Sequence, residues 1–352
     1  MTPLSLTRRR LHEAISYRLR SFAGGRLSSY CRPTSIVLLL TNRCNARCIH
    51  CDIWKNRGQE DRPSLLQWKV LLTDLKEWLG PVQVTLSGGE ALLNQDTIEL
   101  LAFGSSSGLS MELLTHGFWE DQTKIEKLAL ARPARVTISF DGIAETHDLV
   151  RGRTGFVDKT ERTIQTLKRM RQQHRLKMAI RLKTVIMRQN LDDVCEVARF
   201  ARREGLEVFY QAIEQNYNTP EDASWFTHSE TWPANTAKVV SVVRELRELK
   251  SLGFPIANSM AQIDAMIPYF VNPAQWRIAI QSHSAHELKQ FCSALTMLQL
   301  QATGEVIVCN SQPAIGNIKE SSIRQIWQNR PHWWENGCCL DQRSQECSQI
   351  RP

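Results

Sequence analysis

Short apolar runs alternate with longer amphipathic stretches along residues 35–213 of the chain. The runs are rich in Val, Ile and Leu, which is typical of buried strands, and they predict strands at 35–41, 82–87, 110–115, 135–141, 177–187 and 206–213. The stretches after the runs predict helices at 64–80, 93–103, 119–131, 156–173 and 190–204. Strands that alternate with helices predict βαβ units and a parallel sheet. The fold class is therefore α/β, and six such units fit a partial (β/α)6 TIM-like barrel better than a full eight-fold barrel.

Two of the predicted strands depart from a continuous apolar pattern. In the fourth strand Ser139 and Asp141 share one face, and in the fifth strand Arg181 shares a face with Lys183. Because successive side chains of a strand point to opposite faces, one face of each strand carries polar groups. A sheet lined in this way is expected to enclose a site.

The unusual residues follow the predicted strands directly. The stretch "CNARCIHC" (44–51) follows the first strand, "SGGE" ends the second, "THG" the third and "FDG" the fourth. The carboxyl ends of parallel strands are where α/β folds place their active sites. We therefore expect these four loops to surround one site.

Composition limits the cell compartment and the class of partner. The chain has 352 residues and a net charge of +8, with seven arginines in its first 35 residues. That basic arm has no apolar core of a signal peptide, and no run approaches the roughly 20 apolar residues of a membrane span. We expect a cytoplasmic protein with no membrane span and no nucleic-acid partner, although the arm alone leaves a nucleic-acid modifier as a weaker alternative.

Cys44, Cys48 and Cys51 have the spacing C-x3-C-x2-C. Thiolates this close together on one loop hold a soft metal, either zinc or an iron–sulfur cluster. Structural zinc sites use four closed ligands, whereas three cysteines on a four-iron cluster leave one iron open. Clustered cysteines in the reducing cytoplasm also favour metal over disulfides.

In these residues the sequence resembles the radical SAM superfamily over about residues 35–213. The resemblance implies that Cys44, Cys48 and Cys51 are catalytic and hold a [4Fe-4S] cluster whose open iron binds S-adenosylmethionine. It implies that one electron from the reduced cluster cleaves this cofactor. The 5′-deoxyadenosyl radical that results would remove a hydrogen atom from an unactivated carbon.

The resemblance also carries over to the second loop. Gly88, Gly89 and Glu90 match the family's GGE motif, in which the carboxylate meets the ammonium group of S-adenosylmethionine. Ala91 stands where the family often has proline. His50, directly before the third cysteine, stands where an aromatic residue often packs near the adenine, and an exposed loop histidine is the alternative.

Three further cofactor-binding positions follow from the same resemblance. Ser139 and Asp141 fall where the family binds the ribose. Arg181 falls where a basic residue pairs with the carboxylate of S-adenosylmethionine, and Lys183 on the same face is the alternative. His116 replaces an asparagine that the family commonly has before the glycine, so that contact is left open.

The segment "DGIAETHDLVRG" (141–152) resembles the peptide-modifying branch of the superfamily. Its Asp148 and Arg151 are candidates either for a structural ion pair or for substrate contact. Cys195, within an amphipathic stretch, reads as a small core residue.

Half of the ten cysteines lie in the last 61 residues. They fall around a predicted β-hairpin with Gly304 at its turn, and this part resembles the SPASM/twitch extension of radical SAM enzymes. The resemblance implies one auxiliary [4Fe-4S] cluster, held by Cys292, Cys309, Cys347 and one of the adjacent pair Cys338 and Cys339. A zinc site on the same ligands is the alternative. The candidate metal ligands here are Cys292, Cys309, Cys338, Cys339 and Cys347.

The sequence thus predicts four segments and an oxidoreductase or maturase. The segments are a basic arm at 1–34, the partial barrel at 35–214, a mainly helical connection at 215–290 and the auxiliary cluster domain at 291–352. The expected reaction is oxidative modification of a peptide, by crosslinking or dehydrogenation, with a flavodoxin or ferredoxin as reducing partner. Two alternatives stay open: the same chemistry on a small-molecule alcohol, sugar or aminocyclitol, and a non-catalytic iron–sulfur or zinc protein.

Overall fold

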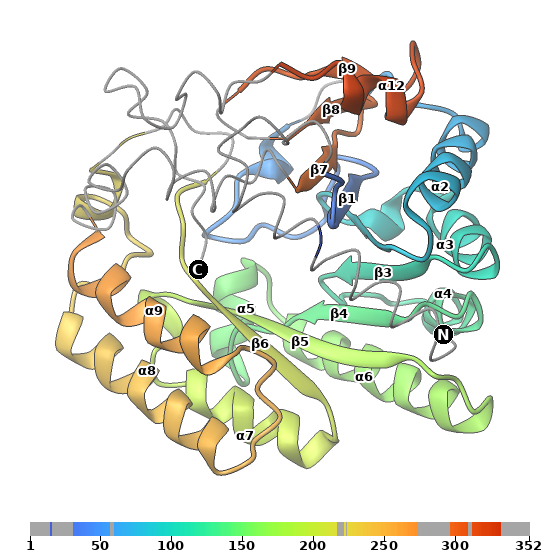
Figure 1. The fold of residues 1–352 in the computed structure, drawn as a ribbon. Helices are drawn as coiled ribbons and strands as arrows, with labels where there is room; N and C mark the ends of the chain where they lie inside the picture. Colours follow the sequence, from blue (N-terminus) through green and yellow to red (C-terminus); the bar gives the residue numbers. More distant parts are fainter. Residues whose placement is uncertain are drawn as a thin grey trace. The chain divides into compact units, whose positions relative to one another are not determined.

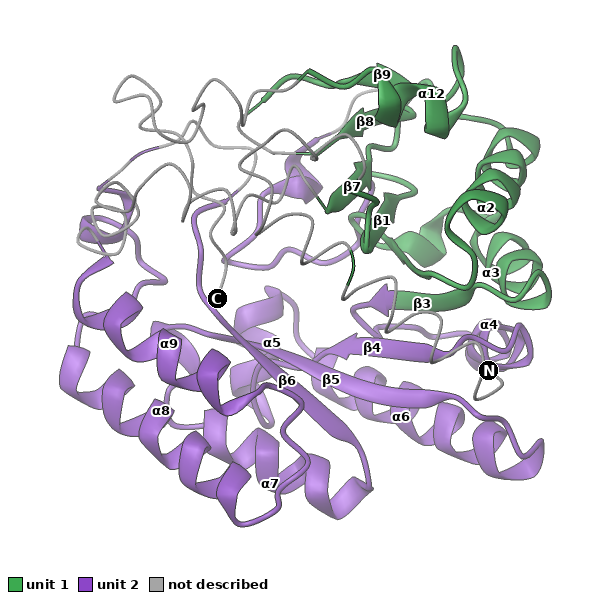
Figure 2. Ribbon diagram, viewed as in Figure 1, with its two compact units in different colours: residues 1–42, 58–113, 277–351 green, residues 43–57, 114–276, 352 purple. Residues whose placement is uncertain are grey.

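The computed structural model describes residue 15 and residues 31–56, 60–216, 222, 224–273, 296–308 and 312–331. The chain divides into two compact units, coloured separately in Figure 2. Unit 1 comprises residues 1–42, 58–113 and 277–351, and unit 2 comprises residues 43–57, 114–276 and 352. Each unit draws on separated stretches of sequence, and the four predicted segments stay predictions.

Unit 1 contains a sheet that begins parallel and ends antiparallel. Its strands, in the order β3-β2-β1-β7-β8-β9 across the sheet, are β3 (Ser110–Thr115, of which residues 110–113 belong to this unit), β2 (Gln83–Ser87), β1 (Ser35–Leu39), β7 (Met297–Leu300), β8 (Glu305–Ile307) and β9 (Gly316–Asn317). Pairing is parallel from β3 to β7 and antiparallel at β8 and β9. In the described part of the unit the helices are α2 (Leu65–Leu79), α3 (Thr97–Ser106) and α12 (Ile323–Gln328), with a 3-10 turn at Ala91–Leu93.

Helix α2 shows how closely local signals fix an element. Ser64 and Gln67 form a reciprocal capping box at its start, and Gly80 follows its last residue with φ +78°. A capping box satisfies two of the free N–H groups at a helix start, and glycine adopts positive φ without strain. The predicted helix at 64–80 is confirmed.

Unit 2 has three parallel strands with helices alongside them (Figure 1). The strands are β4 (Arg135–Ser139), β5 (Ala179–Ile186) and β6 (Glu207–Ala212). The helices are α4 (Gln122–Leu130), α5 (Glu145–Arg151), α6 (Phe156–Gln173), α7 (Val194–Glu204), α8 (Thr236–Ser251) and α9 (Met260–Val271), with 3-10 turns at Ile53–Lys55, Arg188–Asn190 and Trp225–Thr227. The α/β class with parallel strands is confirmed.

The two faces of β5 differ as the sequence predicted. Ile180 and Leu182 are buried, whereas Arg181 and Lys183 on the other face are partly exposed. The polar face therefore belongs to a strand whose apolar face packs against helices.

Two features of the fold were not predicted. Strand β7, the first strand of the predicted C-terminal hairpin, pairs in parallel with β1 from Ser35↔Met297 to Leu38↔Leu300. Helix α5 begins without a side-chain cap, after Ala144 with φ +48°. Neither a parallel pairing across more than 250 residues nor an uncapped helix of seven residues leaves a local signal in the sequence.

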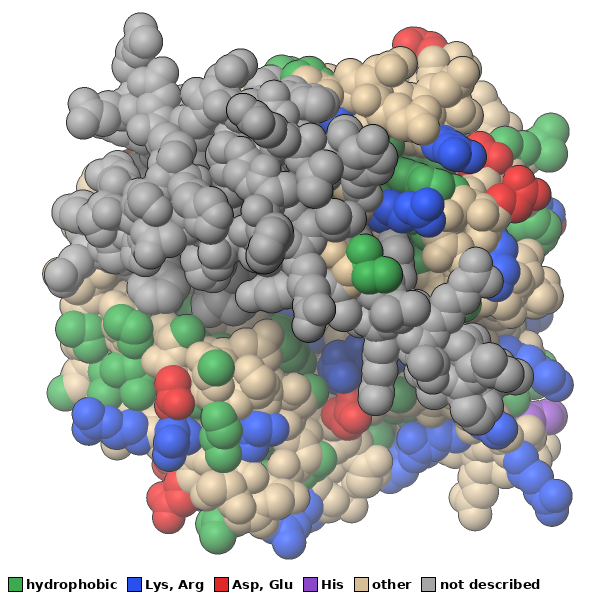
Figure 3. Space-filling view, viewed as in Figure 1, with side chains coloured by type: hydrophobic (Ala, Val, Ile, Leu, Met, Phe, Trp, Pro, Cys, Tyr) green, Lys and Arg blue, Asp and Glu red, His purple; other side chains and the backbone are tan. Residues whose placement is uncertain are grey.

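No helix within the described residues is long and apolar enough to cross a membrane. On the face of the molecule shown in Figure 3, the Lys and Arg side chains of unit 2 are interspersed with acidic ones. The described basic side chains on that face are therefore not gathered into one patch.

Candidate functional site

The three cysteines of residues 44–51 lie in one loop of unit 2. Cys48 is buried and packs with Ala46, Phe118 and Phe156, and the half-buried Cys44 and Cys51 pack against the same cluster. Within the described residues none of the three forms a disulfide bond. Burial raises the pKa of the Cys51 thiol above its ordinary value, although a backbone hydrogen bond from Ile53 opposes the shift. A metal bound to these cysteines would take the place of the thiol protons, so this apolar environment suits a metal-containing group.

The backbone of this cysteine loop is docked on the end of α5. The N–H of Arg47 donates to the carbonyl of Arg151 (3.1 Å), and the N–H of Ile49 donates to that of Val150 (3.0 Å). Gly152 follows with φ +66°, and a Cβ built on it would lie well inside 3.0 Å of the Arg47 carbonyl oxygen. Only glycine permits this approach and this φ together, so Gly152 fixes how the loop is seated.

A side-chain contact holds the loop from a second side. The Nε2 atom of His116 lies 2.6 Å from Oδ1 of Asn45, which stands between the first two cysteines. Because Nδ1 of His116 accepts the N–H of Phe118 (3.0 Å), Nε2 carries the proton and donates it to Asn45. The contact that the sequence left open at His116 is therefore a support for the cysteine loop.

A buried ion pair lies beneath Cys48. Arg151 donates one hydrogen bond from Nη1 to Sγ of Cys48 (3.4 Å) and another from Nη2 to Oδ2 of Asp141. Burial alone would raise the pKa of Asp141, but the Arg151 guanidinium and two histidines outweigh it and lower that pKa. The carboxylate is therefore charged at neutral pH, and it fixes the arginine.

Asp148 has a different structural role. Its Oδ1 accepts the N–H of Val157 (2.8 Å) and its Oδ2 that of Gly155 (2.5 Å), so it caps the start of α6. The alternative of an ion pair between Asp148 and Arg151 is therefore wrong, because Arg151 pairs with Asp141 and Asp148 accepts backbone N–H groups.

His50 lines a pocket of about 300 Å³ in unit 2. Its Nδ1 is buried without a hydrogen-bond partner among the described residues. Burial lowers the pKa of His50 to about 4; Asp141 opposes this shift, whereas Arg151 and Lys183 add to it. A neutral imidazole with an unused nitrogen can hydrogen-bond a ligand. The other lining residues are Glu214, Gln215, Asn216, Asp222, Trp225, His228, Ser229 and Thr231.

The glycine motif belongs to unit 1 and is built from backbone contacts. Gly88 has φ +134°, and a Cβ on it would lie well inside 3.0 Å of the carbonyl oxygen of Thr41. The N–H of Gly89 donates to that same oxygen (2.8 Å). Glu90 is buried, and its Oε1 accepts the N–H of Leu92 (3.1 Å). The motif thus forms a tight turn against the end of β1.

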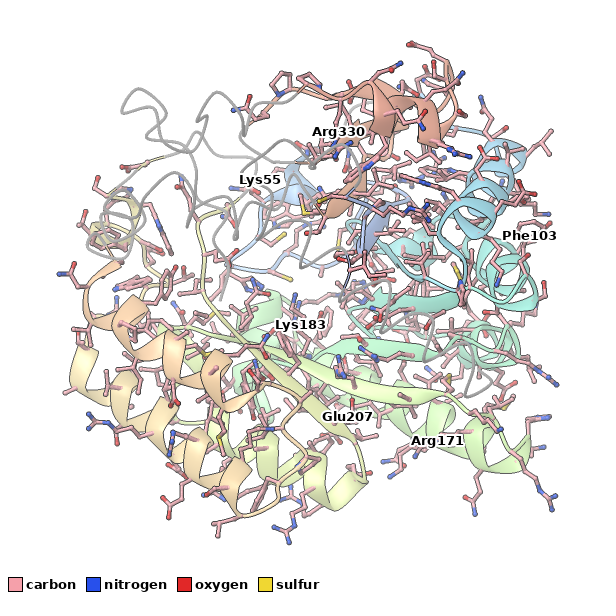
Figure 4. All side chains as sticks on the ribbon, viewed as in Figure 1. Lys55, Phe103, Arg171, Lys183, Glu207 and Arg330 are labelled. Atoms are coloured by element: carbon pink, nitrogen blue, oxygen red, sulfur yellow. The ribbon has the colours of Figure 1, made fainter. Side chains whose placement is uncertain are left out.

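The two basic residues of β5 differ in their surroundings. Arg181 donates from Nε (3.1 Å) and Nη2 (2.8 Å) to Oε2 of Glu207 on β6. Lys183, two residues nearer the carboxyl end, lies opposite Ser139 of β4 and close enough to His50 to lower its pKa. Figure 4 labels Lys183 and Glu207 on their neighbouring strands. The structure therefore groups Ser139, Lys183 and His50, and it places Arg181 in an ion pair outside that group.

The remaining cysteines fall into two sets. Cys195 is buried on α7, where burial and the nearby Glu245 raise the pKa of its thiol to about 12, which fits the predicted core residue. The five predicted auxiliary ligands, Cys292, Cys309, Cys338, Cys339 and Cys347, lie outside the described residues. Within the described residues no group of three or more His, Cys, Asp and Glu side chains is placed to hold a single metal ion.

Sequence reasoning missed three supports of the cysteine loop: Arg151 at the sulfur, Gly152 at the backbone and His116 at Asn45. The segment 141–152 was noticed, but its residues were considered for the substrate or for each other. Their partners lie about 100 positions away in the sequence, which no local pattern shows.

Comparison with known proteins identifies the family of this chain. The radical SAM superfamily model matches residues 38–201, and the SPASM iron–sulfur cluster-binding domain matches residues 292–349. An AdoMet-dependent heme synthase of Methanosarcina barkeri is 24% identical over 306 residues, which cover 84% of this chain and 82% of that protein. A PqqA peptide cyclase of Bradyrhizobium diazoefficiens is 28% identical over 308 residues, which cover 84% of this chain and 73% of that protein.

A similar fold is found in the crystal structure of Streptococcus suis SuiB bound to S-adenosylmethionine. The TM-score is 0.64 at 13% identity, over 91% of this chain and 72% of that one. The chain therefore belongs to the radical SAM superfamily, as an enzyme that uses S-adenosylmethionine and a [4Fe-4S] cluster and carries a C-terminal SPASM domain for auxiliary iron–sulfur binding.

Proposed function

We propose that Cys44, Cys48 and Cys51 hold the [4Fe-4S] cluster, and that the enzyme removes a hydrogen atom from a peptide and modifies it oxidatively. The observation that carries the assignment is the packing of the three cysteines of one loop on a single apolar cluster. Three thiolates suit a four-iron cluster that keeps one iron open for S-adenosylmethionine, whereas a structural zinc ion takes four protein ligands. When bound, the reduced cluster supplies the electron that cleaves S-adenosylmethionine to the 5′-deoxyadenosyl radical.

The chain's own residues bind and orient the cofactor. Gly88 and Gly89 leave the backbone open to close approach, and Glu90 provides a carboxylate for the ammonium group. Lys183 supports the cofactor carboxylate better than Arg181 does, since Arg181 is paired with Glu207.

The remaining two contacts concern the ribose and the adenine. Ser139 is the better ribose partner, because both carboxylate oxygens of Asp141 accept hydrogen bonds within unit 2. His50, with its unused Nδ1 at the edge of the pocket, would accept a hydrogen bond from the adenine or stack on it.

The C-terminal cysteines support the oxidative outcome. Cys292, Cys309, Cys347 and one of Cys338 and Cys339 would hold one auxiliary [4Fe-4S] cluster. Such a cluster can accept the second electron after hydrogen abstraction, so that dehydrogenation or crosslinking follows.

The relatives support two substrate classes. The peptide cyclase shares the higher identity of the two over a similar stretch, which favours a peptide. The heme synthase is matched over more of its own length, which favours a porphyrin-type substrate as the second candidate. An alcohol or aminocyclitol stays a further alternative.

An acidic flavodoxin or ferredoxin is the proposed reducing partner. Exposed cations flank the cysteine loop: Arg47 and Lys55 lie 5.1 and 5.5 Å from the ring centre of Trp54. Such charges would steer an acidic protein toward the loop, and salt would weaken the attraction. Reduced thiols and this partner fit a cytoplasmic location.

The proposed function is tested by cleavage of S-adenosylmethionine under anaerobic conditions. Protein reconstituted with iron and sulfide is mixed with dithionite and S-adenosylmethionine, and 5′-deoxyadenosine is quantified. We expect the product from the wild type and from Cys195→Ala, which removes a buried thiol of α7, and none from Cys48→Ala. Product from Cys48→Ala at the wild-type rate would refute the assignment of the cysteine loop.

A candidate peptide is then identified by mass. A peptide substrate loses two hydrogen atoms per modification, whereas a porphyrin-type substrate would turn over while added peptides stay unchanged.

A further inference from the structure

Arg151 joins a cysteine sulfur to a buried carboxylate, and the proposed function gives it no role. Its Nη1 donates to Sγ of Cys48 at 3.4 Å, and its Nη2 donates to Oδ2 of Asp141. Arg151 is 6% exposed and Asp141 is fully buried. Charged groups are rarely buried this deeply unless they are paired and hydrogen-bonded. The contact of Arg151 with the Cys48 sulfur is thus fixed by the pairing of Arg151 with Asp141.

Asp141, whose carboxylate binds Arg151, is fixed by three further hydrogen bonds, one to its side chain and two to its backbone. Its Oδ1 accepts the N–H of Val185 (2.8 Å). The backbone carbonyl of Asp141 accepts Nδ2 of Asn190 (2.7 Å), and its N–H donates to Nδ1 of His147 (3.1 Å). Asp141 therefore cannot shift without breaking hydrogen bonds to β5, to the 3-10 turn at Arg188–Asn190 and to α5, so the carboxylate that binds the guanidinium is held in place.

We propose that Arg151 is a positioning residue for the iron–sulfur cluster, which holds the Cys48 sulfur in place and raises the reduction potential of the cluster on the cysteine loop. This proposal rests on the assignment of Cys48 as a cluster ligand. Hydrogen bonds to cluster sulfurs and nearby charge are among the factors that set iron–sulfur potentials.

The direction of the effect follows from electrostatics. Reduction adds one negative charge to the cluster and its sulfurs, so a positive donor against a sulfur stabilises the reduced form. The guanidinium contacts the sulfur, whereas the carboxylate contacts the guanidinium, so the positive end of the pair lies nearer to the sulfur. In a buried site this difference is screened less than it would be in water.

The test uses variants that keep the fold. Arg151→Met alone would leave Asp141 buried and unpaired, so it is combined with Asp141→Asn, which removes both charges. Arg151→Lys keeps the charge but loses the second donor arm. Arg153→Met is the matched control, because it removes an exposed arginine two positions away that contacts the Phe118 ring rather than a sulfur.

The readout is the midpoint potential of the cysteine-loop cluster, from electron paramagnetic resonance during a redox titration. The signal of this cluster is the one absent from the triple variant Cys44→Ala, Cys48→Ala and Cys51→Ala. Iron per chain and thermal unfolding of the iron-free protein are recorded for every variant.

We expect the double variant to need about tenfold more reducing conditions for half reduction, a shift of about 59 mV to more negative potential. Arg151→Lys should show a smaller shift, and Arg153→Met should match the wild type. Loss of iron from a double variant whose iron-free form unfolds normally would also support the positioning role. Equal potentials in the double variant and the Arg153→Met control would overturn the proposal while the proposed function stands. Absence of a four-iron signal from the wild type would instead refute the proposed function.

Discussion

The cysteine loop of unit 2 and the glycine turn of unit 1 are held in different ways. The loop depends on side chains from other elements, since Arg151, His116 and Phe118 contact it through hydrogen bonds or packing. The turn depends on its own backbone, because Gly88 and Gly89 close directly on the carbonyl of Thr41. The glycine turn can be recognised from its own sequence alone. The cysteine loop is completed by residues that its sequence motif does not contain.

The largest effect should come from breaking the charge pair beneath the loop. Arg151→Met leaves the Asp141 carboxylate buried without its partner, and this costs about 3–5 kcal/mol of unfolding free energy. Adding Asp141→Asn should recover most of that loss. Denaturant unfolding of the iron-free proteins measures both. A single variant as stable as the wild type would show that the pair does not support the loop.

Glycine substitutions separate the two regions. Gly152→Ala places a Cβ against the Arg47 carbonyl at φ +66°, and Gly88→Ala places one against that of Thr41 at φ +134°. Each should cost about 2–4 kcal/mol. Gly152→Ala should also lower iron binding, whereas Gly88→Ala should keep the iron of the cysteine loop and lose S-adenosylmethionine affinity.

Gly155→Ala is the control for these two variants. Gly155 has φ +74° and no atom within 4 Å of the added Cβ, so this substitution introduces backbone strain but no steric clash. If iron content fell equally in Gly152→Ala and Gly155→Ala, the close approach to Arg47 would not be what seats the loop.

A pH effect of intermediate size belongs to the network beneath the loop. Burial, with the charge of Arg151, lowers the pKa of His147 to about 3 from its ordinary value of 6.5, although Asp141 opposes the shift. Between these values the unfolded chain binds a proton that the folded chain does not. The free energy of unfolding therefore falls as pH falls below about 6.5, by at most about 1.4 kcal/mol per pH unit.

Denaturant unfolding at pH 7 and pH 5 measures this loss in iron-free protein. His147→Asn keeps an acceptor for the Asp141 N–H but does not titrate, so its loss between the two pH values should be smaller than that of the wild type. An equal loss in both proteins would assign the pH dependence to other groups.

The smallest effect on stability is expected at β5. Arg181→Gln breaks a surface pair with Glu207 and should change stability by about 0–1 kcal/mol, with S-adenosylmethionine affinity unchanged. Lys183→Gln should weaken that affinity instead, as isothermal titration would show. The reverse result would restore Arg181 as the carboxylate partner.

These differences explain what could be predicted from the sequence. Helix α2 could be predicted because the signals at its two ends, Ser64 and Gly80, lie next to it in the sequence. The strands could be predicted because each apolar run is likewise a local signal. The cysteines and the GGE motif were found because their spacing is itself the signal. Arg151 was assigned no cluster contact because its partner Cys48 lies 103 positions away, and the parallel pairing of β7 with β1 was missed for the same reason.

The most direct measurement is iron and zinc per chain after anaerobic reconstitution, for the wild type and for the triple variant Cys44→Ala, Cys48→Ala and Cys51→Ala. Two four-iron clusters predict about eight irons in the wild type and about four in the variant. Stoichiometric zinc in the wild type, or equal iron in the two proteins, would contradict the assignment of the cysteine loop as the seat of the cluster.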